Sequence, residues 1–154
     1  MTDYQDDEQT FELDFSKATV KEDLFLCEIK QAKLHTKVNE QGETTHSISM
    51  KLEIVEGPFK GTQGSTFLGL DMSKGMNARR VKNFMESMLG ESLTDNETLK
   101  FETNAAGDKE VVGAVGENIG AYMATNKDGF VNVTLKGFTP ASVFDAKSDD
   151  EEPF

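Results

Sequence analysis

The residues that could do chemistry in this chain are basic and aromatic side chains, most of them in its middle part. Residues 30–82 hold nine Lys and Arg against five Asp and Glu, although the whole chain has a net charge of −12. Ammonium and guanidinium groups bind phosphates, and aromatic rings stack on nucleic-acid bases. The combination predicts a surface that binds a single strand through backbone and bases. The candidate residues are Lys30, Lys33, Lys37, Lys51, Lys60, Arg79, Arg80 and Lys136, with the rings of Phe59, Phe67, Tyr122, Phe130 and Phe138.

Each kind of candidate also has a structural interpretation that needs no ligand. Scattered lysines commonly form a solvated face. Phe67 and Phe138 can instead pack against a helix or a terminal arm, and basic side chains of a helix can pair with Glu86. These alternatives stay open on sequence alone, and the clustering of the candidates favours a binding surface.

Residues typical of catalytic or metal sites do not form a constellation in this sequence. His35 and His46 lack Cys or carboxylate partners at metal-ligand spacing, so they are interpreted as surface histidines. Cys27 lies in an apolar strand pattern and is expected to be a small buried side chain. The segment "GPFKG" (57–61) lacks the ending of a phosphate-binding loop and is interpreted as a turn. The sequence therefore predicts a binding protein that is not an enzyme and has no cofactor and no metal.

The C-terminal tip is acidic and ends in an aromatic residue. Its sequence is "DDEEPF", in which the four acids should keep the segment extended and solvated. The ring and terminal carboxylate of Phe154 could enter an apolar pocket with an arginine on a partner protein. A plain solubility tail would explain the acids but not the final Pro-Phe. The predicted partner-binding residues are Asp149, Asp150, Glu151, Glu152, Pro153 and Phe154.

Length and charge distribution predict one folded domain between two acidic ends. The chain has 154 residues, one cysteine and no apolar run of membrane-spanning length. Residues 1–10 carry four acids and no base, and residues 145–154 carry five acids and one lysine. We therefore expect a flexible acidic N-terminus (1–10), a folded domain (11–144) and a flexible acidic tail (145–154). The protein is expected to be soluble and intracellular, with no membrane contact.

The elements that must position the candidate residues are mainly strands. Period-two alternation predicts strands over 24–34, 46–56, 65–70, 119–125 and 129–138, the last two forming a hairpin. In the second strand Ile48, Met50, Leu52 and Ile54 should face inward. In the last strand Val131, Val133 and Leu135 should share one face, with Phe130, Lys136 and Phe138 on the outer face. A short arm over 11–16 could pack through Phe11, Leu13 and Phe15.

One helix is predicted over 76–90, between the third and fourth strands. Its buried stripe should consist of Val81, Phe84, Met85, Met88 and Leu89, with Asp71 or Ser73 capping its start and Gly90 ending it. Residues 91–118 allow either a short helix, a loop or a strand. Five strands with one helix after the third predict a mainly β protein with an OB-fold, a five-stranded β-barrel.

Parts of the sequence resemble single-stranded DNA-binding proteins. The tip "DDEEPF" is similar to the bacterial tip that ends Asp-Asp-Asp-Ile-Pro-Phe, with Glu152 in place of Ile. The body resembles a bacteriophage-encoded family of single-stranded DNA-binding proteins. The similar segments are "LDFS" (13–16), "LFLCEIKQA" (24–32), "MKLEIVEGPFKG" (50–61), "LGLDMS" and "ARRVKNFMESMLG" within 68–90, and "LKGFTPA" (135–141).

This resemblance implies an OB-like fold and sequence-independent binding of single-stranded DNA in phage replication, recombination and repair. It implies a location in the cytoplasm of the infected bacterial host. The tail would recruit a helicase, primase, polymerase or recombinase. Two other classes stay open: an acidic inhibitor or DNA mimic that binds a host DNA-processing enzyme, and a phage structural protein. Homo-oligomerisation is also left open.

Overall fold

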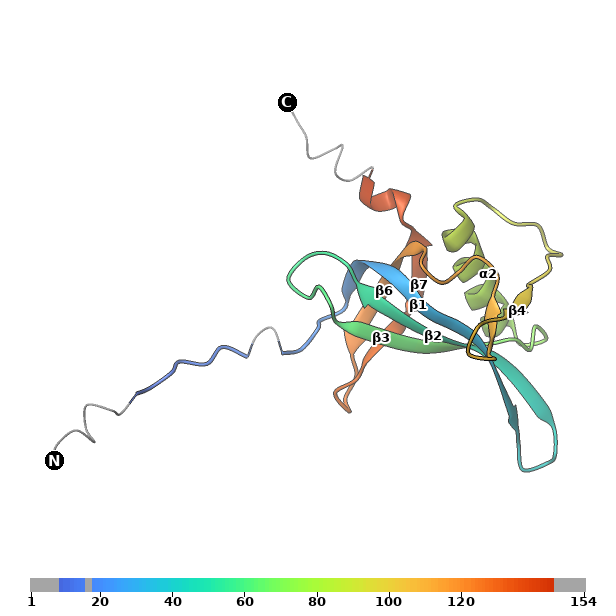
Figure 1. Cartoon of the computed structure of the whole chain (residues 1–154), viewed down its shortest axis with the longest axis horizontal. Helices are drawn as coiled ribbons and strands as arrows, with labels where there is room; N and C mark the ends of the chain where they lie inside the picture. Colours follow the sequence, from blue (N-terminus) through green and yellow to red (C-terminus); the bar gives the residue numbers. More distant parts are fainter. Residues whose placement is uncertain (1–8, 16–17, 146–154) are drawn as a thin grey trace.

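The computed structural model describes residues 9–15 and 18–145, which form seven strands and one long helix (Figure 1). Residues 142–145 add a single helical turn. The described part contains no helix long and apolar enough to span a bilayer. The acidic ends 1–10 and 145–154 lie almost entirely outside the described residues, so their flexibility stays a prediction. The elements are β1 (Asp23–Val38), β2 (Thr44–Ile54), β3 (Gln63–Gly69), α2 (Gly75–Leu89), β4 (Phe101–Thr103), β5 (Lys109–Val111), β6 (Asn118–Thr125) and β7 (Val131–Pro140).

Five of the strands close into a ring. β1 pairs with both β2 and β6, β2 pairs with β3, and β6 pairs with β7, all antiparallel. The ring closes where β3 runs parallel to β7, at Ser65 and Asn132. These five strands are the five that the sequence predicts, and the mainly β class is confirmed. The segment left open by the sequence contains the extra hairpin β4–β5, which pairs with β1.

The core lies inside the ring and is built from alternate residues of each strand. The inward positions predicted for β2 are confirmed, because Ile48, Met50, Leu52 and Ile54 are all fully buried. In β1 the register against β2 shifts between Ile29 and Gln31. This bulge keeps Ile29 and then Ala32 inside, although they are three residues apart.

Helix α2 begins one residue before the predicted start and packs against β7, β3 and β6. Val81 and Phe84 are buried as predicted, but Leu89 is exposed and Ser87 is buried instead. Leu89 lies about 100° further round the helix than Met88, which turns it out of the stripe. The N-cap is Lys74 without a side-chain cap, so the predicted cap was wrong. Gly90 ends the helix in the left-handed region, at φ 74°, as predicted.

Strand β7 contains a second irregularity, and it reverses the predicted faces of the strand beyond Val133, which is buried as predicted. Met123 pairs with Val133, whereas Ala121 pairs with Phe138, so β7 has three extra residues between these two pairs. Leu135 is therefore 74% exposed, and Phe138 is only 4% exposed. The Phe138 ring packs edge-on against Phe84 of α2, with centroids 5.5 Å apart. The predicted outward position of Phe138 was wrong, because alternation does not continue through the insertion.

Gly137 allows the irregular backbone path of β7 next to Phe138. Its replacement by alanine should destabilise the protein. Its φ is 77°, and an added Cβ would collide with Oδ1 of Asn83. That oxygen accepts a hydrogen bond from the Phe138 amide at 2.7 Å. We expect Gly137→Ala to lower the free energy of unfolding by roughly 1–3 kcal/mol, the usual cost of such strain.

Chemical denaturation followed by circular dichroism measures this change. Gly75→Ala is the matched control, since Gly75 opens α2 and an added Cβ there meets nothing within 4 Å. The control should keep or slightly raise the stability. Equal stabilities for the two variants would contradict the strained geometry at Gly137.

The predicted N-terminal arm does not pack on the domain. Residues 9–15 run away from the ring as an extended segment (Figure 1). Phe11, Leu13 and Phe15 are 76%, 69% and 71% exposed. Three large apolar side chains at alternate positions therefore face solvent.

Candidate nucleic-acid interface

The outer surface of β1, β2 and β3 brings together several of the predicted residues. Lys33 of β1 pairs with Ser49 of β2, which pairs with Phe67 of β3. One row further on, His35 lies beside Ser47. Because successive side chains of a strand point to opposite faces, residues two apart share this surface. We call it the β1–β3 face, made by Gln31, Lys33, His35, Lys37, Ser47, Ser49, Lys51, Ser65 and Phe67.

The face continues onto β7. Ser65 pairs with Asn132, and the Ser65 hydroxyl donates to Oδ1 of Asn132 at 3.4 Å. Phe130, two residues before Asn132, is 68% exposed. Strand alternation places its ring on the same side as Asn132. Lys51 thus lies in a row of polar residues that runs from Gln31 through Ser65 to Asn132.

Two exposed rings stand apart on this surface. Phe67 is 56% exposed, and its centroid lies 5.5 Å from that of the His35 ring at an interplanar angle of 60°. Phe67 and Phe130 lie on opposite sides of the Ser65–Asn132 pair along parallel strands. Four residue steps at about 3.3 Å put them roughly 13 Å apart along the strands. The two rings could therefore stack on different bases of one strand.

Lysines supply positive charge around these rings. Lys37 and Lys51 are exposed, and neither takes part in a salt bridge within residues 9–15 and 18–145. Lys33 is different, since its Nζ lies 3.9 Å from Oδ2 of Asp108. Lys37 and Lys51 are therefore the most available positive charges of the face.

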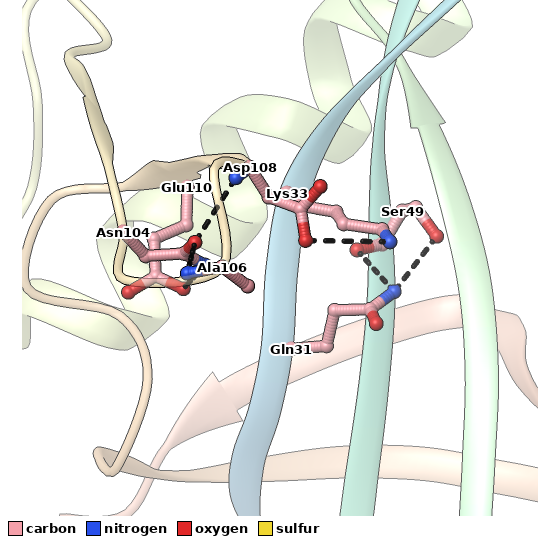
Figure 2. A network of polar contacts seen from close by, with 7 residues as sticks. All are labelled: Gln31, Lys33, Ser49, Asn104, Ala106, Asp108 and Glu110. Atoms are coloured by element: carbon pink, nitrogen blue, oxygen red, sulfur yellow. Dashed lines mark hydrogen bonds and ion pairs between the residues drawn. The ribbon is translucent and has the colours of Figure 1, made fainter.

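An acidic hairpin borders the face on the β1 side (Figure 2). Glu110 of β5 pairs with Lys33, and the turn between β4 and β5 brings Asp108 over β1. Asn104 orders this turn: its Oδ1 accepts from the amides of Ala106 and Asp108, and its Nδ2 donates to Glu110 at 3.0 Å. The hairpin thus holds a carboxylate against one lysine of the face.

A hydrogen bond across the strands adds an ordered polar group beside Lys33. Nε2 of Gln31 donates to the Ser49 hydroxyl at 3.1 Å and to the Ser49 carbonyl at 3.4 Å (Figure 2). Gln31, Ser49, His35 and Asn132 were not among the residues predicted from the sequence. Strand alternation in the sequence could have identified two of them, because it places Gln31 and His35 on the same side of β1 as Lys33 and Lys37.

Arg80 of helix α2 forms hydrogen bonds to the part of β3 that carries Phe67. Arg80 donates from Nη2 to Oγ1 of Thr66 at 3.0 Å and from Nη1 to the Phe67 carbonyl at 3.4 Å. Burial lowers the pKa of the Arg80 guanidinium, which still stays charged as arginine does in proteins. Arg79 is exposed and instead lines a groove beside α2. Arg80 therefore supports the aromatic platform, and Arg79 lies outside it.

Tyr122 and Lys136 lie elsewhere on the ring. Tyr122 belongs to β6, which is not adjacent to β2 or β3, and Lys136 belongs to β7. Nζ of Lys136 is 5.7 Å from the Tyr122 ring centroid and 3.3 Å from Oε1 of Glu22. Hydrogen bonds from Thr134 and Lys136 lower the pKa of Glu22, so this lysine faces a carboxylate. The pair forms a separate cluster.

The remaining predicted residues are also separated from the β1–β3 face or buried. Phe59 is half-buried and packs edge-on against Phe25 at 6.0 Å, so its role as a stacking ring stays a prediction. Lys60 is exposed in the β2–β3 turn. Lys30 sits at the β1 bulge with its Nζ 3.3 Å from Glu28. The predicted tail residues 149–154 lie outside the described part of the chain.

Candidate metal ligands and the thiol of Cys27 do not form a reactive site within the described residues. Within them, no group of three or more His, Cys, Asp or Glu side chains could hold a metal ion. Cys27 is fully buried, and burial raises the pKa of its thiol to about 12. A thiol in that state is a poor nucleophile.

No protein-family model matches this sequence, and no curated protein matches it. Its function therefore has to be inferred from the surface that the fold assembles.

Proposed function

We propose that this protein binds single-stranded DNA, without sequence preference, on the β1–β3 face and Phe130. The observation that carries the proposal is Phe67, a large ring that is 56% exposed, in the row of Lys33 and next to the row of Lys51. Base stacking of this kind contributes about 1–3 kcal/mol per base and tolerates any sequence, because every base has a π-face. Lys37 and Lys51 would bind the phosphates on either side.

We further propose that the five-stranded ring is an OB-fold. The closed ring, the parallel contact of β3 with β7 and the position of α2 after the third strand support this assignment. OB-folds bind oligonucleotides on the surface of strands 2 and 3. The corresponding surface here is the one that carries Ser49, Lys51 and Phe67.

The biological role that fits this binding is non-enzymatic coating and protection of exposed strands during phage replication, recombination or repair. The acidic tip 149–154 would recruit a replication or recombination protein, and the site of action would be the cytoplasm of the infected bacterium. These statements rest on the resemblance of the sequence segments and on the Pro-Phe ending.

Fluorescence anisotropy with labelled oligo-dT and a matched duplex tests the binding. Full-length protein and a chain that ends at Asp145 would be compared at two salt concentrations. We expect both to prefer the single strand, with weaker binding at higher salt. The shorter chain should bind equally or more tightly, because it lacks three net negative charges.

Absence of binding by both chains would overturn the proposal and favour the acidic inhibitor of a host DNA-processing enzyme. In that case the full-length chain, and not the shorter one, should inhibit such an enzyme. A strand affinity that collapses when only Phe154 is removed would contradict the assignment of the tip to a protein partner.

A further inference from the structure

An apolar groove beside α2 is not filled by any described part of the chain. It lies between α2 and the segment 93–101 and has a volume of about 610 Å³. This groove does not belong to the β1–β3 face. Its apolar lining includes Leu70, Met72, Met85, Leu93, Leu99 and Phe101. A groove of this composition is suited to side chains of another segment.

Charge and an open strand edge lie next to this α2–β4 groove. Arg79 and Lys82 line its α2 side, and residues 74–82 hold four bases and no acid. Asp95 and Glu97 line the opposite side, where Glu97 accepts a hydrogen bond from the Thr94 amide at 3.2 Å. β4 is the last strand of the sheet order and pairs only with β5. Its other edge can accept an extended chain through backbone hydrogen bonds.

The N-terminal arm has the complementary features. Phe11, Leu13 and Phe15 alternate with polar residues, so an extended arm presents three apolar side chains on one face. Exposed apolar residues that gather in this way mark interaction sites. Residues 1–16 hold six acids and no base, opposite in sign to residues 74–82. The apolar side chains of the arm therefore match the apolar lining of the groove, and its acids match Arg79 and Lys82 on the α2 side.

The arm does not occupy the groove of its own molecule, since Phe11, Leu13 and Phe15 are exposed. It leaves the ring on the side away from α2 and β4 (Figure 1). Every copy of the chain nevertheless carries one arm and one groove. We propose that the arm of one copy binds the α2–β4 groove of a second copy, with the rings in the groove and the backbone along β4. This association is independent of DNA binding and would link copies of the protein to one another.

Disulfide trapping between two variants that each carry one added cysteine tests the contact directly. Leu13→Cys lies in the arm, and Met72→Cys lies in the groove at a side chain that is 48% exposed. The native Cys27 is buried with its pKa at about 12, so it should not compete. We expect a mixture of the two variants under mild oxidation to yield a covalent heterodimer, identified by mass spectrometry.

The matched control pairs Leu13→Cys with Lys60→Cys, an exposed position in the β2–β3 turn. Equal yields in the two mixtures would overturn the proposal. So would a double variant, Leu13→Cys with Met72→Cys, that forms its bridge within a single chain, since the arm would then bind its own groove.

Sedimentation velocity over a concentration series provides a second test that does not depend on cysteine chemistry. The triple variant of Phe11, Leu13 and Phe15 to alanine should associate less than the unmodified protein. Because these side chains are exposed, the substitutions should not affect folding. Val38→Ala with Leu135→Ala is the control, since both side chains are exposed outside the arm. A monomeric unmodified protein, or unchanged association of the triple variant, would overturn the proposal.

Discussion

Replacing Phe67 and Phe130 together with alanine is expected to cause the largest loss of single-strand affinity. Each ring should stack on a separate base, and each stacked base contributes about 1–3 kcal/mol. The double variant should therefore lose roughly 2–6 kcal/mol, or at least about 20-fold in affinity, at a tenfold change per 1.4 kcal/mol. Anisotropy with labelled oligo-dT at one fixed salt concentration measures the change. Both side chains are more than half exposed, so the fold should persist.

Leu135→Ala is the matched control for this experiment. Leu135 is 74% exposed on β7, the strand that Phe130 immediately precedes, and it lines a hollow with Met76 and Asn83 of α2. Its replacement should leave the affinity unchanged. If the double variant bound oligo-dT as tightly as the unmodified protein, stacking on these rings would be refuted. Equal losses in the control would show a general effect of removing apolar surface.

The second large effect concerns the lysines of the face. Changing Lys33, Lys37 and Lys51 together to glutamine removes three positive charges that lie on one surface. Each phosphate contact contributes about −0.7 to the slope of log affinity against log salt for a single strand. The triple variant should therefore lose about 2 from the magnitude of that slope. It should also bind more weakly at low salt. Titrations at several salt concentrations measure both quantities.

The three lysines are not expected to contribute equally. Lys33 lies near Asp108, so a phosphate has to compete with that carboxylate, whereas Lys37 and Lys51 are in no salt bridge within the described residues. Single Lys37→Gln and Lys51→Gln variants should thus reduce the slope more than Lys33→Gln.

A second triple variant controls for net charge. Lys30, Lys60 and Lys136 lie at the β1 bulge, in the β2–β3 turn and beside Glu22, outside the central rows of the face. Their change to glutamine removes the same charge and should leave the slope nearly unchanged. Equal loss of slope in both triple variants would show that binding follows net charge and has no defined surface.

The acidic hairpin places negative charge beside the proposed DNA path. Asp108 and Glu110 are anchored by Asn104 and by the pairing of β5 with β1, so their charges stay beside Lys33. Fixed carboxylates next to a phosphate-binding surface weaken binding and narrow the path of the strand. The hairpin therefore marks one lateral limit of the proposed DNA path.

The amino-acid sequence by itself determined the strands, the helix and much of the inner surface. Alternation is a local property of a strand, so Ile48, Met50, Leu52 and Ile54 could be placed inside before any contact was known. The same rule placed Lys51 on the outer face, where it is exposed. Gly90 could be assigned to the helix end because few other residues adopt its left-handed conformation.

Only the tertiary structure decided which exposed residues form one surface. The insertion in β7 buried Phe138 and exposed Leu135, because a local change in register reverses every face beyond it. Phe59 packs on Phe25, 34 positions away in the sequence. The β4–β5 hairpin lies beside Lys33, although the hydrophobic pattern of its segment has no clear period that would have predicted it. His35 joins the face through a ring contact with Phe67 on a different strand. Such contacts depend on strand pairing over long separations, which the local pattern of residues does not encode.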